Sequence, residues 1–184
     1  MTEKQQQFAL RLKEFQPTPW DQIPDLGLYM DQVITFVERQ CKTLFMEDDR
    51  IFTPAMVNNY VKIGLIERPT AKKYGREQLA QLLMICVLKQ SVSAENMKAL
   101  VQPPEAISMQ QHYEAFCQAE LAVLSSLGDV LPMPIMDCAL RGSAYLLLCN
   151  TLLRAPKAEN DKAAHSHSKE SQAKAEPAKG DKKK

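Results

Sequence analysis

The residues best suited to chemistry are amides and cations near the middle of the chain. On a helical wheel, segment 54–63 divides into two faces. One face is apolar, and the other carries Asn58, Asn59 and Lys62 around the small Ala55. In a DNA major groove, Asn can pair with adenine and Lys can reach guanine or phosphate. We therefore predict that 54–63 is a DNA recognition helix; an ordinary solvated helix face is the alternative.

A basic loop follows this helix directly. The segment 67–76 contains four cations and a tyrosine: Arg68, Lys72, Lys73, Arg76 and Tyr74. Residues 50–100 include eight basic and three acidic side chains, whereas 1–49 and 101–153 are each net negative. A short cationic loop beside a polar helix face suits contacts with DNA phosphates. A solvated basic loop without a partner remains the other interpretation.

Catalysis finds little support in the sequence. His112 is the one histidine before residue 154, and no nucleophile motif, phosphate-binding glycine loop or zinc-protease pair accompanies it. The five cysteines form no CxxC pair, which favours reduced core residues over a metal site. We predict no enzyme, no catalytic residue, no metal and no cofactor. The polar start and the lack of a long apolar run predict a cytoplasmic protein that does not enter a membrane.

The pattern of apolar residues predicts an all-α fold. Six glycines in 184 residues and no sustained period-two alternation argue against strands. Thr53-Pro54 predicts a helix start, Gly64 predicts its end, and Ser93 predicts the cap of a short helix. The expected helices span 3–15, 26–46, 54–63, 76–90, 94–101, 106–127 and 135–153.

The central segment resembles the winged helix-turn-helix of MerR-type transcription regulators. The likeness lies in the order of its parts: Met56-Val57 and Tyr60, then Gly64-Leu65-Ile66, a basic loop ending in Tyr74, Gln78-Leu79-Ala80-Gln81-Leu82, and a Ser-initiated helix at 93–101. The resemblance implies a recognition helix at 54–63, a wing at 67–75 and a supporting helix pair at 76–101. This chain has Asn58 and Asn59 where that family usually has an arginine and an aromatic residue, and its wing is shorter.

A second likeness covers roughly residues 20–101. The pieces Trp20, Ile23-Pro24, Leu28–Val33, Met56–Lys62 and Lys72-Lys73-Tyr74 are similar to an uncharacterised bacterial family with a domain of unknown function. This resemblance supports the helical layout and implies no biochemical activity.

These patterns predict four parts of the chain. They are an N-terminal helix or arm (1–19), a helix-turn-helix-like domain (20–104), a C-terminal helical hairpin (105–153) and a disordered basic tail (154–184) that lacks large apolar residues. The helix at 135–153 is apolar nearly all round, so either the rest of the chain or a second subunit must cover it. We expect a homodimeric transcription regulator that binds double-stranded DNA. The alternative is a helical protein-interaction module that does not bind DNA.

Overall fold

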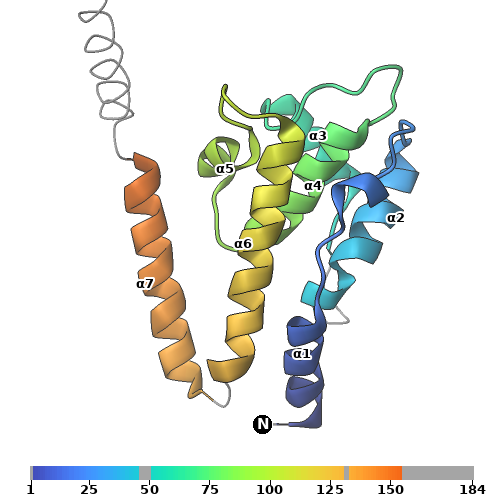
Figure 1. Ribbon diagram of the computed structural model, residues 1–184. Coiled ribbons are helices and arrows are strands. Elements are labelled where there is room, and N and C mark those ends of the chain that lie inside the picture. Colours follow the sequence, from blue (N-terminus) through green and yellow to red (C-terminus); the bar gives the residue numbers. More distant parts are fainter. Residues whose placement is uncertain (1, 46–50, 131–132, 155–184) are drawn as a thin grey trace, which may run out of the picture. The chain divides into compact units, whose positions relative to one another are not determined.

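The computed structural model describes residues 2–45, 51–130 and 133–154, and within these ranges the fold is all-α, as predicted. Two isolated β-bridges occur there, and no strand. The helices, shown in Figure 1, are α1 (Glu3–Glu14), η1 (Trp20–Gln22), α2 (Met30–Cys41), η2 (Lys42–Leu44), α3 (Pro54–Lys62), α4 (Arg76–Leu88), α5 (Ala94–Val101), α6 (Met109–Val130) and α7 (Ile135–Arg154). Apart from Arg154, the last residue of α7, the predicted disordered tail lies outside the described residues.

Local sequence signals account for the starts of α3 and α5. Thr53 and Ser93 cap α3 and α5 through their hydroxyl oxygens, as their positions predict. The prediction that a helix starts at residue 26 was wrong, because α2 begins at Met30. Leu28 forms an antiparallel bridge with Tyr74, so the chain is still extended at Leu28 and Tyr29, and the Tyr29 amide then donates a 2.9 Å hydrogen bond to the Gln32 side chain.

The core is built around α4. Every residue from Leu79 to Cys86 is buried, which fits a helix with apolar residues on all sides and neighbours all round. Helices α2, α5 and α6 pack against it. Their buried contributions include Val33 and Val37 from α2 and Val101 from α5. This packing fixes the position of α4. The loop that follows α3 ends at the start of α4, so that end of the loop is fixed as well.

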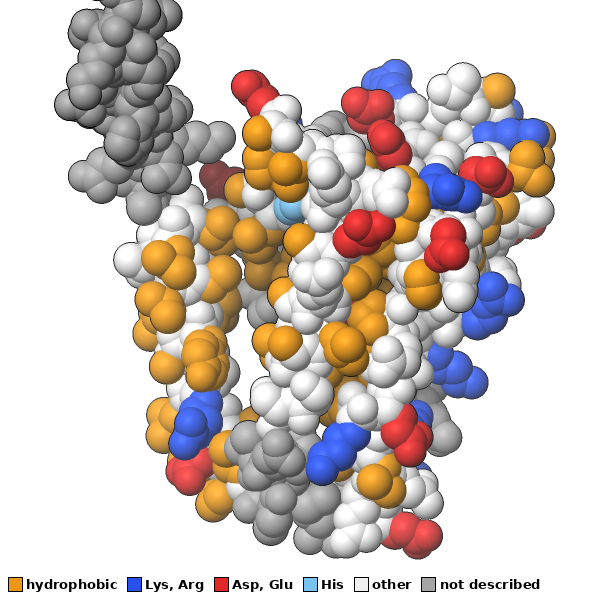
Figure 2. All heavy atoms as spheres, viewed as in Figure 1, with side chains coloured by type: hydrophobic (Ala, Val, Ile, Leu, Met, Phe, Trp, Pro, Cys, Tyr) orange, Lys and Arg blue, Asp and Glu red, His pale blue; other side chains and the backbone are white. Residues whose placement is uncertain are grey.

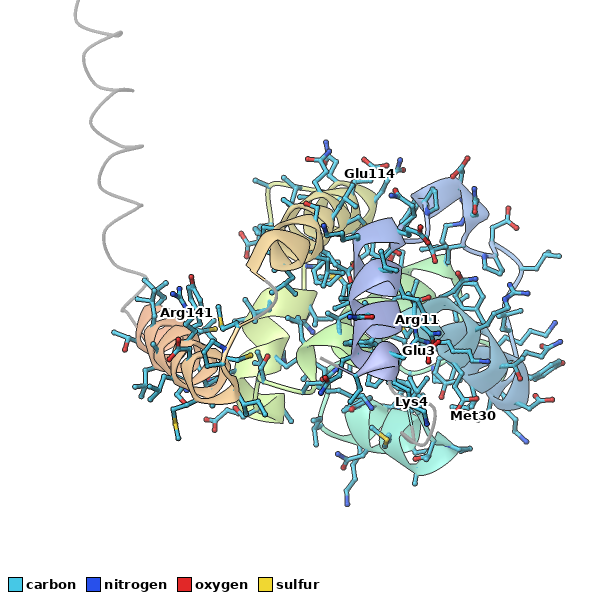
Figure 3. All side chains as sticks on the ribbon, turned by 90° about the horizontal axis from the view of Figure 1, so that it is seen from below. Glu3, Lys4, Arg11, Met30, Glu114 and Arg141 are labelled. Carbon is cyan, nitrogen blue, oxygen red and sulfur yellow. The ribbon has the colours of Figure 1, made fainter. Side chains whose placement is uncertain are left out.

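Aromatic residues and α1 complete the domain. The rings of Trp20 and Tyr113 lie 6.1 Å apart, and the Tyr113 hydroxyl donates a 2.8 Å hydrogen bond to the Thr18 carbonyl. His112 has a structural role. Its Nε2 lies 2.8 Å from the Leu100 carbonyl oxygen, and because a carbonyl oxygen can only accept, Nε2 donates this hydrogen bond. Helix α1 packs against α6 and η2, and Figure 3 shows it beside α6, with Arg11 on α1 labelled.

Helix α7 differs from the other helices in its exposure. Contacts divide the chain into a unit of residues 1–147 and a second unit from Leu148 onward, of which the structure describes the last turns of α7. Large apolar side chains of α7 are exposed, among them Ile135 at 86%, Tyr145 at 68% and Leu147 at 70%. In the first unit, α7 therefore presents large apolar side chains to solvent. None of the described helices is long and apolar enough to cross a membrane.

Candidate nucleic-acid interface

Helix α3 is defined sharply at both ends. The Thr53 hydroxyl oxygen accepts a hydrogen bond from the Met56 amide at 3.3 Å, and Pro54 occupies the first turn, where its missing N–H costs nothing. At the other end, Gly64 adopts a φ of +68°. The Leu65 amide donates to the Tyr60 carbonyl, and the Gly64 amide donates to the Val61 carbonyl. This pair of bonds is a Schellman motif, so the chain leaves α3 in a fixed direction.

The two faces of α3 have the predicted character. Val57 and Tyr60 are buried, and the Tyr60 ring lies 6.0 Å from that of Phe52. Asn58, Asn59 and Lys62 are exposed. Within the described part of the chain, these three side chains form no hydrogen bond or ion pair. Their amide and ammonium groups are therefore available to a partner.

The basic loop after α3 contains a tight turn. The Lys73 amide donates a 2.9 Å hydrogen bond to the Thr70 carbonyl across an antiparallel bridge. Ala71 and Lys72, between them, have φ values of 50° and 63°. Two left-handed residues in a two-residue loop are the signature of a type I′ turn, which normally uses Asn or Gly. Such strain at non-glycine residues is concentrated at functional sites in proteins.

Contacts at both ends hold the loop in place. Tyr74 is buried and exchanges two 2.9 Å backbone hydrogen bonds with Leu28. The Gln78 side chain accepts from the Gly75 amide at 2.7 Å and donates to the Glu67 carbonyl at 3.0 Å. A Cβ at Gly27 would lie 2.7 Å from the Lys73 Cβ, so this close approach requires glycine. The turn is therefore positioned by the fold.

The cations of the loop fall into two groups. Arg68, Lys72 and Lys73 are exposed, and the Lys73 ammonium lies 5.2 Å from the centre of the Tyr29 ring. Arg76 instead faces its own chain. Its Nε donates to the Ile23 carbonyl at 2.8 Å, and its guanidinium lies 3.6 Å from the Asp25 carboxylate and 5.9 Å from the Trp20 ring centre.

These contacts distinguish the seven predicted DNA-contacting residues. Six of them are exposed on α3 or the loop that follows it, whereas Arg76 has a structural role in fixing the segment before α2. Glu67 within this loop and Glu77 directly after it are also exposed and reduce the positive charge of the loop. Tyr29 was missed by sequence reasoning, although it is 49% exposed and contacts Lys73. No spacing rule links residues 29 and 73, so no sequence signal could have identified this contact.

Comparison with known proteins identifies one family. A family model described as a domain of unknown function, DUF1836, matches residues 18–116, which is just over half of the chain. The match includes α2–α5 and the loop between α3 and α4. It begins after α1 and ends within α6, so α7 lies outside it. No curated protein and no solved structure matches the chain.

Proposed function

We propose that this chain, which belongs to the DUF1836 family, is a DNA-binding transcription regulator. Helix α3 enters the major groove, and the exposed cations of the basic loop at 67–76 contact backbone phosphates. Asn58 reads a base edge, while Asn59 and Lys62 contact the backbone near it. Arg68, Lys72 and Lys73 supply the remaining phosphate contacts.

The observation that carries the proposal is the outward face of α3. Its amide and ammonium groups have no partner among the described residues, while the opposite face is packed into the core. A rigid helix with one free polar face, followed by a fixed cationic turn, has the parts that major-groove recognition needs. The resemblance to the MerR-type helix-turn-helix belongs to this proposal, with α3 as recognition helix and the type I′ turn as a short wing.

A protein-interaction module is the second candidate. Two observations favour it: Arg76 is occupied within the chain, and Leu26 and Tyr29 are exposed near the same loop at 79% and 49%. Exposed apolar and aromatic side chains are typical of protein interfaces. In that case the same α3 face and loop would bind another protein, and DNA affinity would be absent.

Single substitutions on α3 test the proposal. A binding site is first selected from a random DNA library with the full-length protein. Asn58→Ala should then weaken binding to that site by about 1–3 kcal/mol and affect unrelated DNA less. Lys62→Ala should weaken binding to all sequences and lower the salt dependence by about one phosphate contact. Lys4→Ala removes the same charge from α1 and is the matched control.

The outcomes separate the two candidates. Normal folding with weakened DNA binding by the two α3 variants supports the recognition-helix proposal. Equal DNA binding by wild type and both variants would contradict it. Absence of DNA binding by the wild type would favour the protein-interaction module, and the same variants would then be assayed for loss of a protein partner.

A further inference from the structure

Helix α7 carries an exposed apolar stripe with heptad spacing. We call this stripe the α7 seam; it consists of Ile135, Cys138, Gly142, Tyr145, Cys149 and Leu152. The steps between these residues alternate between three and four, which places all six on one side of the helix. Ile135, Tyr145 and Leu152 are exposed by 86%, 68% and 66%, Cys138 and Gly142 are also exposed, and Cys149 is half-buried. Figure 2 shows hydrophobic side chains along the α7 surface.

Gly142 leaves space on the seam for a large side chain. It lies inside α7, where glycine is less favourable for the helix than alanine. An added Cβ there would meet nothing within 4 Å, so the described chain gives no reason for glycine. A glycine within an apolar stripe provides room for a large side chain from a neighbouring helix.

The seam is complementary to itself in the antiparallel direction. When a second copy of α7 runs antiparallel, one register pairs every seam position: Gly142 with Tyr145, Cys138 with Cys149, and Ile135 with Leu152. Gly142 of each copy then faces Tyr145 of the other copy, so the smallest seam residue meets the largest one at two places. A parallel pair would instead place Tyr145 against Tyr145 and leave a void between the two glycines. We propose that α7 forms an antiparallel coiled coil with α7 of a second copy of this chain.

The apolar area on the seam side of α7 sets the size of this interface. Full burial of a leucine-sized side chain removes roughly 60–120 Å² of apolar surface from water. Five large apolar side chains on or beside the seam are exposed by 38% or more: Ile135, Tyr145, Leu146, Leu148 and Leu152. Together they offer roughly 300–600 Å² per copy at most, less than the roughly 800 Å² of a standard interface, which fits a dimer of moderate affinity.

The native cysteines provide a direct test of the pairing. The full-length protein is oxidised with diamide, which accepts the two hydrogens released when two thiols form a disulfide. The antiparallel register predicts a covalent dimer with Cys138 of one chain linked to Cys149 of the other, identified by peptide mapping. Cys138–Cys138 and Cys149–Cys149 bridges, or no inter-chain bridge, would overturn the proposal.

A matched pair of variants tests the role of Gly142 without oxidation. Gly142→Leu fills the space for Tyr145 of the partner and should raise the dimer dissociation constant at least about tenfold in sedimentation equilibrium. Ser143→Leu adds the same side chain one residue away, outside the seam, and should leave that constant within about threefold. A monomeric wild type at micromolar concentration, or equal dimerisation by both variants, would overturn the proposal. Neither result depends on DNA binding.

Discussion

We predict that Glu120 on α6 makes the stability of the domain depend on pH. Its Oε1 atom is buried and has no hydrogen-bond partner among the described residues. The side chain lines a small cavity of about 20 Å³ together with Cys41 and Tyr113, and two leucine and two phenylalanine residues line the same cavity. Burial raises the pKa of this carboxyl from 4.5 to about 7, since water can no longer solvate the ionised form.

The size and sign of the effect follow from this pKa. Between pH 4.5 and about 7, folded Glu120 holds a proton that the unfolded chain releases, so stability falls as pH rises. The contribution of Glu120 to folding stability is greatest below the pKa of the unfolded chain, 4.5, and it is lost as pH rises through the folded-state pKa of about 7. At 1.36 kcal/mol per pKa unit, the loss reaches at most about 3 kcal/mol at high pH.

Substitution of Glu120 by glutamine tests this reasoning. Glu120→Gln removes the ionised form, so the variant should be more stable than wild type by up to about 3 kcal/mol near pH 8, and this gain should shrink toward pH 5. Urea unfolding followed by circular dichroism at both pH values measures the difference. Glu114→Gln, an exposed change on the same helix, should alter stability by less than about 0.5 kcal/mol. A gain for Glu120→Gln that is equal at both pH values would refute the assigned cause.

Three further predictions concern α3 and its loop. Tyr60→Ala removes a buried ring that contacts Phe52 and should destabilise the fold by about 3–5 kcal/mol in the same unfolding assay; a loss below about 1 kcal/mol would show that the ring is not part of the core. Gly64→Ala places a side chain at a left-handed residue and should cost about 1–2 kcal/mol, with no cost expected if α3 ends differently. Gln78→Ala removes both loop contacts and should increase amide hydrogen exchange at 67–75; unchanged exchange would contradict the role of Gln78.

Local sequence rules predicted the helices well. Thr53-Pro54 and Gly64 defined the bounds of α3 because capping and left-handed termination depend on residue types within one turn. The burial of α4 fits its composition, since apolar residues on nearly all sides of the helix leave little of it for solvent. The exposed and buried faces of α3 also followed from helical periodicity.

Features that depend on distant contacts could not be predicted from the sequence. The turn at Ala71-Lys72 lacks the Asn or Gly that normally indicates type I′ geometry, and its conformation is supported by the pairing of Tyr74 with Leu28. That same pairing delays the start of α2. The sequence also shows Arg76 as one more cation in a basic loop, whereas the fold directs its side chain to Ile23.

The central claim is that the polar face of α3 and the cationic turn bind double-stranded DNA. Retention of fragmented genomic DNA by the immobilised full-length protein, measured at low and high salt, tests it most directly. The account predicts retention at low salt that falls steeply as salt rises, and a weaker salt dependence when Lys62 and Lys72 are both replaced by alanine. No retention at low salt, or retention that the double variant matches at every salt concentration, would contradict it.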